Sequence, residues 1–147
     1  MDNPVLSGYK LTVNFDVDKL NRNEDPVTIE GPFTPPTSKD LLIKPGIALI
    51  VLELVTLHRA EGGPAAEFPT YPIEWFDWLE DGAGTRATSQ PECFQVQRFS
   101  ETRCTIVDYN TTLHWSGSSS HPFNVAVSYN NKTYGSDPTI VNEPEDG

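Results

Sequence analysis

One ten-residue segment concentrates the side chains best suited to binding. In IEWFDWLEDG, residues 73–82, three large aromatic rings fall within four positions, and four carboxylates lie in the same segment. Aromatic rings supply contact area, and carboxylates supply hydrogen-bond acceptors that orient a ligand or a partner protein. The segment therefore predicts a surface for a protein partner or, alternatively, for a carbohydrate. The residues of this candidate surface are Trp75, Phe76, Asp77, Trp78 and Glu80.

The same segment has a second, structural interpretation. At helical spacing Ile73, Phe76 and Leu79 share one face. A short helical turn would then cover an open end of a hydrophobic core with its rings, and the acidic residues would keep this cover soluble. The sequence leaves open whether the rings are buried or exposed.

The sequence predicts no metal site and no cofactor. A blue-copper centre needs two histidines, a cysteine and usually a methionine, but His114 follows Cys104 by ten positions and the single methionine is the first residue. Two cysteines without CxxC spacing do not form a closed zinc site. Asp16 and Asp18, and the acids of residues 77–81, offer oxygen ligands to calcium, but neither set has EF-hand spacing.

Nucleophilic catalysis also lacks a recognisable motif. The chain contains no GxSxG sequence, and flexible-loop composition explains the serines of SGSSSHP, residues 116–122. GAGT, residues 82–85, lacks the lysine of a phosphate-binding loop. We therefore expect a protein that is not an enzyme. A hydrolase with two catalytic carboxylates is the remaining enzymatic alternative, because a sequence does not reveal their separation.

Alternating patterns place these residues on or between β-strands. Residues 10–17, KLTVNFDV, and 123–129, FNVAVSY, are apolar at every second position, as half-buried strands are. Residues 47–57, IALIVLELVTL, are apolar on both faces and rich in β-branched side chains, which predicts a strand in the middle of a sandwich. Asn130-Asn131 predicts a two-residue hairpin turn.

About seven or eight such strands and the lack of a helical period predict an all-β fold, an antiparallel β-sandwich of Ig-like or cupredoxin-like plan. We expect one domain, residues 1–147. Residues 60–92 are expected to be an irregular insertion carrying a short helical turn, and residues 142–147 an acidic tail.

Charge and composition exclude several partner classes. The formal net charge is −11 and the ten basic residues are scattered, so neither nucleic acid nor an anionic membrane is an expected partner. The longest apolar run has 11 residues, which is too short to span a bilayer. No signal peptide is recognisable, so we expect a cytoplasmic protein in which Cys93 and Cys104 are free thiols.

Three segments carry a resemblance to a known family. HPFNVAVSYNNKTYGSDPTI, residues 121–140, resembles the closing hairpin and final Asp-Pro-Thr-Ile of the bacterial inclusion-body proteins, which are AidA/PixA-like. YKLTVNFDVDKL, residues 9–20, and DLLIKPGIALIVLELVTL, residues 40–57, are similar in layout. The resemblance implies a cytoplasmic β-sandwich that has no catalytic residues and tends to self-associate.

These observations give one expected function and one alternative. We expect a non-catalytic protein-binding or self-assembly module of a bacterial cytoplasm. The alternative is a β-sandwich that binds a small ligand, most plausibly a carbohydrate, through Trp75, Phe76 and Trp78.

Overall fold

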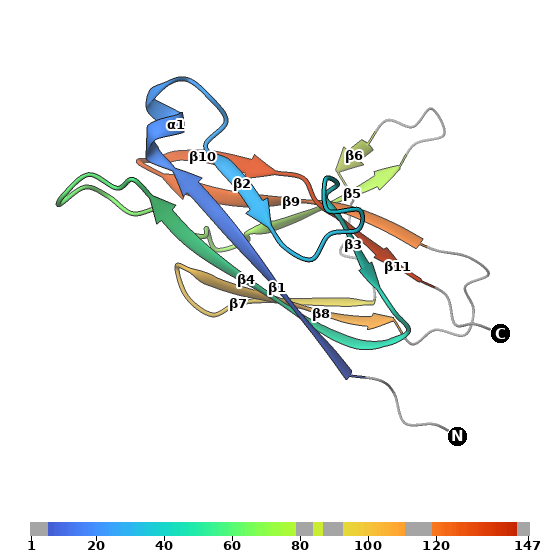
Figure 1. Cartoon of the computed structure of the whole chain (residues 1–147). Coiled ribbons are helices and arrows are strands. Elements are labelled where there is room, and N and C mark those ends of the chain that lie inside the picture. Colours follow the sequence, from blue (N-terminus) through green and yellow to red (C-terminus); the bar gives the residue numbers. More distant parts are fainter. Residues whose placement is uncertain (1–5, 79–83, 87–92, 111–118, 144–147) are drawn as a thin grey trace.

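A computed structural model describes residues 6–78, 84–86, 93–110 and 119–143 of the chain. Within these ranges the chain forms two β-sheets and one short helix (Figure 1). The helix is α1 (Val17–Asn21). The strands are β1 (Leu6–Asp16), β2 (Val27–Glu30), β3 (Asp40–Ile43), β4 (Gly46–Leu57), β5 (Ile73–Trp78), β6 (Gly84–Arg86), β7 (Phe94–Arg98), β8 (Arg103–Asn110), β9 (Ser119–Tyr129), β10 (Lys132–Ser136) and β11 (Thr139–Asn142).

The first sheet has the strand order β2-β1-β4-β8-β7, and its central pair is parallel. β1 and β4 pair in parallel from Leu6 opposite Ile47 to Asp16 opposite Leu57. The second sheet has the order β3-β11-β9-β5-β6, and β10 pairs with β9 beside β11. β3 and β11 are also parallel.

The all-β fold is confirmed, but the sheets are mixed rather than antiparallel. The connection between β1 and β4 gives the physical reason, because it leaves the first sheet, forms β3 in the second sheet and returns. The returning strand therefore enters the first sheet in the direction of β1. The described residues also contain eleven strands instead of the expected seven or eight.

Three local predictions were wrong. Residues 73–78 form β5 instead of a helical turn, with Ile73 opposite Val125 and Trp75 opposite Phe123. The interval 60–92 is therefore not irregular throughout, since it contributes β5 and β6 to the second sheet. The expected tail begins too early, because Asn142 is a buried residue of β11.

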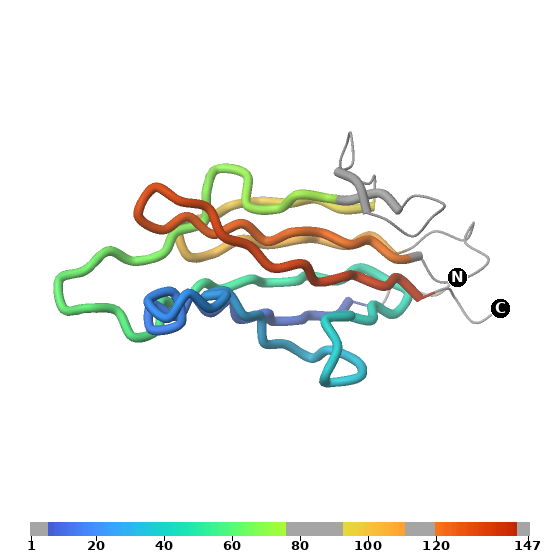
Figure 2. Tube along the Cα trace, turned by 90° about the horizontal axis from the view of Figure 1, so that it is seen from above, coloured from blue at the N-terminus to red at the C-terminus, as the bar shows by residue number. Residues whose placement is uncertain are grey.

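The core lies between the two sheets and joins inward-facing side chains of both. The first sheet contributes Phe15 and Phe94, and the second sheet contributes Phe123. Phe15 stacks on Tyr129 with ring centroids 4.7 Å apart, which links β1 to the end of β9. The molecule is elongated along its strands, and a second direction of view shows the same elongation (Figure 2).

The predicted hairpin turn is confirmed. Asn130 and Asn131 have φ angles of 51° and 65° and connect β9 to β10, with Tyr129 opposite Lys132. Asparagine tolerates this left-handed conformation better than most residues. Cys104 lies opposite Arg98 in the β7–β8 pair, and both cysteines are free thiols. Among the described residues, no helix has the length and apolar character needed to cross a membrane.

Candidate functional site

Trp75, the first ring of the predicted binding surface, belongs to the core. Its side chain is 5% exposed and stacks on Phe94 with centroids 4.4 Å apart and an interplanar angle of 14°. Phe123 lies against it at 5.3 Å. This ring is therefore not available to a partner or a sugar at the surface. It is buried, as the structural interpretation expected, but in a strand instead of a helical turn.

The remaining residues of that surface stay a prediction. The structure describes only the backbone of Phe76, Asp77 and Trp78, as the second half of β5, and Asp77 lies opposite Thr85 of β6. Glu80 lies outside the described residues. The structure does place three other groups of side chains in arrangements that sequence reasoning missed.

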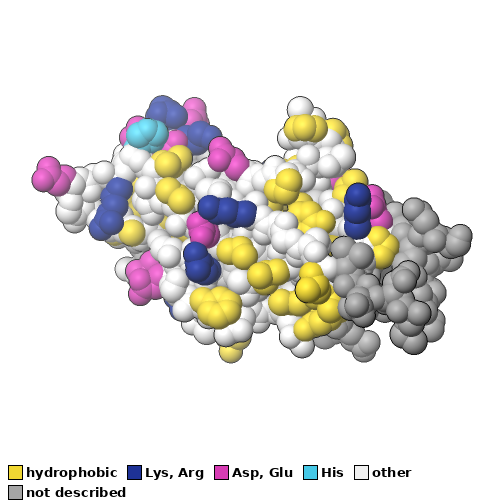
Figure 3. Space-filling view, turned by 60° about the horizontal axis from the view of Figure 1, so that its bottom comes forward, with side chains coloured by type: hydrophobic (Ala, Val, Ile, Leu, Met, Phe, Trp, Pro, Cys, Tyr) yellow, Lys and Arg dark blue, Asp and Glu magenta, His cyan; other side chains and the backbone are white. Residues whose placement is uncertain are grey.

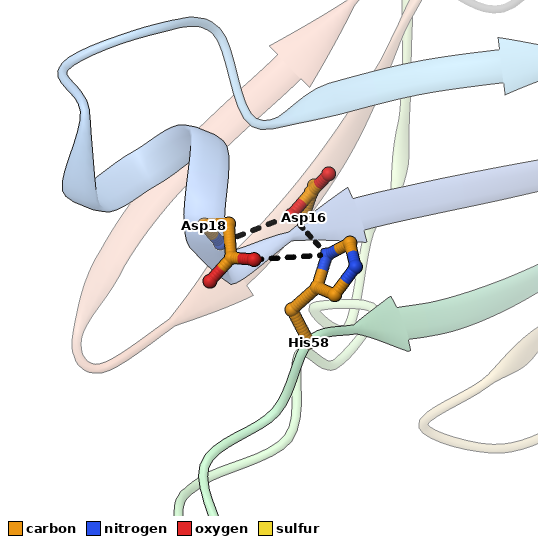
Figure 4. Close-up of side chains that lie close together, drawn as sticks. All are labelled: Asp16, Asp18 and His58. Atoms are coloured by element: carbon orange, nitrogen blue, oxygen red, sulfur yellow. Dashed lines mark hydrogen bonds and ion pairs between the residues drawn. The ribbon is translucent and has the colours of Figure 1, made fainter.

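The first group joins the end of β1 to the end of β4. Asp16 caps α1, because its Oδ1 accepts hydrogen bonds from the backbone N–H groups of Asp18 (2.9 Å) and Lys19 (3.4 Å). The Nδ1 atom of His58 lies 2.8 Å from the same oxygen and 3.5 Å from Asp18 Oδ2 (Figure 4). We call these three residues, Asp16, Asp18 and His58, the clasp.

The clasp shifts the protonation equilibria of its members in opposite directions. The hydrogen bond that His58 donates to Asp16, helped by the charges of Asp16 and Asp18, raises the pKa of His58 above its ordinary value. The hydrogen bonds that Asp16 accepts from His58 and from the backbone N–H groups at the start of α1 lower the pKa of Asp16. Both shifts favour the charged pair, so the clasp holds the β1–α1 corner against the end of β4 most firmly when His58 is protonated.

The clasp has the residue types of a metal site, and its ligand atoms lie within 4.8 Å of one another. Its hydrogen bonding opposes this use. Asp16 Oδ1 is already occupied by two backbone N–H groups and by His58. The partial positive charge of the first N–H groups of a helix also disfavours a cation there. The geometry therefore supports a structural role for the clasp.

In a catalytic triad, a carboxylate also holds and orients the imidazole of a histidine. Such a triad needs a nucleophile on the ring. Among the described residues, the recorded partners of the His58 ring are the two carboxylates of the clasp. His58 is thus paired with acids, but a catalytic triad does not follow from its contacts.

The second group covers the outer face of the first sheet, the face turned away from the core. Its outward positions on β4 alternate with the buried ones, and five of them are apolar: Ile47, Leu49, Val51, Val55 and Leu57. Leu49 is 45% exposed and Val55 is 40% exposed. Leu6 of β1, opposite Ile47, is 75% exposed. Hydrophobic side chains are thus spread over this side of the molecule (Figure 3).

Ion pairs cross the middle of this outer face. Glu53 Oε1 accepts a hydrogen bond from Arg103 at 2.7 Å, and Glu53 Oε2 lies 3.1 Å from Lys10 Nζ. These bonds lower the pKa of Glu53, with the Arg103 bond as the larger cause. The charges at the centre are therefore paired, with two basic residues against one acidic residue.

The third group is buried between the sheets, at the end of the molecule opposite α1. Asp108 of β8 is fully buried, and Asn142 of β11 is 3% exposed. The side-chain amide of Asn142 donates a hydrogen bond from Nδ2 to Asp108 Oδ1 at 3.1 Å. Burial raises the pKa of Asp108 to about 7, against the opposing effect of this hydrogen bond.

Comparison with known proteins gives no family for this chain. No protein-family model matches the sequence, and no curated protein matches it. Among solved structures, the N-terminal domain of phage TP901-1 ORF48 is similar over 95% of this chain and 98% of that chain. The sequence identity is 11% and the TM-score is 0.33, so the likeness carries no functional conclusion.

The sequence contains signals for two of the three groups that sequence reasoning missed. The order Asp16-Val-Asp18 before a short polar run is a helix N-cap signal, and it was available. The unusual apolar outward face of β4 was visible as a run that lacks alternation. Nothing in the sequence joins Asp108 to Asn142, because 34 positions and a change of sheet separate them.

Proposed function

We propose that this chain is a non-catalytic protein-binding module that self-associates through the outer face of its first sheet. The observation that carries the proposal is the combination of exposed Leu6, Leu49 and Val55 on one sheet face. Monomeric soluble proteins rarely leave large contiguous apolar patches exposed, and such patches mark interaction sites.

Charge supports a second copy as the partner. Two copies of a chain with a net charge of −11 repel each other, so a self-pairing surface must avoid a local excess of acid. The centre of the outer face meets this condition, since Lys10 and Arg103 flank Glu53. In a two-fold pairing, the glutamate of one copy can face the basic side chains of the other.

The size of the face is compatible with this partner. Five strands at a spacing of about 4.8 Å, with a rise of about 3.3 Å per residue, give a flat area of about 600 Å². Stable interfaces bury roughly 1,200–2,000 Å² in total, or about 600–1,000 Å² on each partner, so the face lies at the lower end of this range. Shallow hollows beside the ion pairs, one of them lined by Phe99, Ser100 and Thr102, give the surface relief that a second copy could fill.

The resemblance of residues 9–20, 40–57 and 121–140 to bacterial inclusion-body proteins agrees with a self-associating β-sandwich. We therefore propose a bacterial cytoplasm as its location. The carbohydrate alternative loses support, because the ring of Trp75 is enclosed by Phe94 and Phe123.

Sedimentation equilibrium tests the proposal directly. The wild-type chain should form dimers or larger species, and Leu49→Glu should shift it toward the monomer. Tyr71→Glu is the matched control, because Tyr71 is 84% exposed and lies outside the first sheet. Association should strengthen as salt screens the net charge. A wild-type chain that stays monomeric, or equal association of the two variants, would contradict the proposal.

A further inference from the structure

A hydrogen-bonding deficit lies inside the core. The single bond between Asn142 Nδ2 and Asp108 Oδ1 leaves one oxygen of each side chain without a partner, namely Asp108 Oδ2 and Asn142 Oδ1. Both atoms are buried. An unpaired polar atom in the core loses its hydrogen bonds to water without replacement and destabilises a protein, so two in one hydrogen-bonded pair call for a physical explanation.

The explanation depends on the protonation state of Asp108. A carboxylate has only acceptors, and the amide oxygen of Asn142 is also an acceptor, so these two oxygens cannot bond to each other. A carboxylic acid has one donor and one acceptor, as the amide does. The edges of an acid and an amide are therefore complementary.

We propose that Asp108 is held as the neutral acid and donates its proton from Oδ2 to Asn142 Oδ1, which closes a cyclic pair of hydrogen bonds between β8 and β11. The pair joins the first sheet to the second. A single added proton satisfies both unpaired oxygens, because one becomes a donor and the other accepts from it.

The described surroundings favour the neutral acid. Asp108 lies opposite Ala48 of β4 and Phe94 of β7, which are both apolar. Cys93, whose Sγ is 3.9 Å from Asn142 Nδ2, is the titratable neighbour on the β7 side. Burial is the main cause that raises the pKa of this thiol to about 12, so it is neutral as well.

Among the described residues, the second sheet places no positively charged side chain next to Asp108. From β11 the facing side chain is Asn142 itself. From β9, the ring of His121 lies edge-on to Phe94 at 4.9 Å, and burial lowers the pKa of His121, which favours its neutral form. None of these described groups compensates a negative charge on Asp108, so loss of the proton leaves a buried carboxylate facing the amide oxygen.

The pair consequently makes the contact between the sheets sensitive to pH. The folded chain retains a proton that the unfolded chain releases in the ordinary aspartate range. Between about pH 4 and pH 7, this group should lower the folding equilibrium constant about tenfold for each pH unit, because the states differ by one bound proton. The folding equilibrium constant stops falling once Asp108 releases its proton in the folded chain as well.

The test compares Asp108→Asn with wild type by urea unfolding across that pH range. The amide introduced at this position can form the same two hydrogen bonds with Asn142 but cannot titrate. The variant should lack the component of about tenfold per pH unit, and its stability relative to wild type should rise with pH. Asp137→Asn, which makes the same substitution at an exposed position, should keep the wild-type profile. Parallel profiles for Asp108→Asn and wild type would overturn the proposal.

A second measurement needs no variant. Carboxyl ¹³C resonances of the wild-type chain, labelled at aspartate, report each titration directly. One buried carboxyl should titrate near neutral pH while the chain stays folded. If all aspartates titrate in the ordinary range, Asp108 is a carboxylate and the cyclic pair does not exist, whether or not Asp108→Asn folds.

Discussion

Truncation of Trp75 to alanine should be among the most destabilising single changes in this chain. The ring is 5% exposed and stacks on Phe94. Truncating a buried aromatic residue to alanine removes about 3–5 kcal/mol of stability, and the lost stacking adds roughly 0.5–1.5 kcal/mol. This sum is a large part of the roughly 5–15 kcal/mol that stabilises a typical domain.

Trp75→Phe should behave differently because two effects oppose each other. The indole Nε1 is buried without a hydrogen-bond partner. Removing this donor should recover about 1–3 kcal/mol, whereas the lost ring volume should cost about 1–2 kcal/mol. The net change in the free energy of unfolding should therefore lie near zero.

Urea denaturation, followed by far-UV circular dichroism, measures all of these variants in the same way. Tyr71→Ala is the matched aromatic control, and its stability should stay within about 0.5 kcal/mol of wild type because Tyr71 lies at the surface. A loss of less than about 1 kcal/mol for Trp75→Ala would refute the placement of this ring in the core.

Three further predictions concern the turn, the thiols and the clasp. Asn131→Gly should stabilise the β9–β10 hairpin by a few tenths of a kcal/mol in urea unfolding, because φ is 65° there and Asn-Gly favours such turns. Cys93 and Cys104, whose burial raises both pKa values to about 12, should resist alkylation in the folded chain and react in urea, as mass spectrometry would show. The ring of His58 should titrate in NMR above its ordinary pKa, and Asp16→Asn should reverse this shift. The stabilisation from protonated His58 should be complete below its unfolded pKa and should disappear as the pH rises through the higher folded value.

Local patterns were sufficient for much of the fold. The alternation of residues 10–17 and 123–129 reflects one buried face, and it located β1 and β9. Asn130 and Asn131 have a backbone preference of their own, so their turn could be predicted without tertiary information. Parallel pairing of β1 with β4 could not, because it depends on the chain visiting the second sheet between them.

The candidate site was harder to predict for the same reason. Residues 73–78 have apolar side chains at helical spacing (Ile73 and Phe76) and also at alternate positions (Ile73 and Trp75), and pairing with β9 decides between the two structures. Asp16 and His58 are 42 positions apart in sequence, and the parallel register brings them together. Interactions that depend on sheet pairing cannot be predicted from the types of neighbouring residues in the sequence.

The position of β11 sets an order of events for folding. This strand follows all other strands of the sandwich in the chain, yet it lies between β3 and β9. Until β11 has been synthesised, β3 lacks the described neighbour with which it pairs, and the inward face of the first sheet lacks part of its cover. Contacts between distant segments form slowly, and the surfaces that wait for them are prone to aggregate. A growing chain should therefore carry an open second sheet until β11 is free to pair, and chaperones would encounter it in that state.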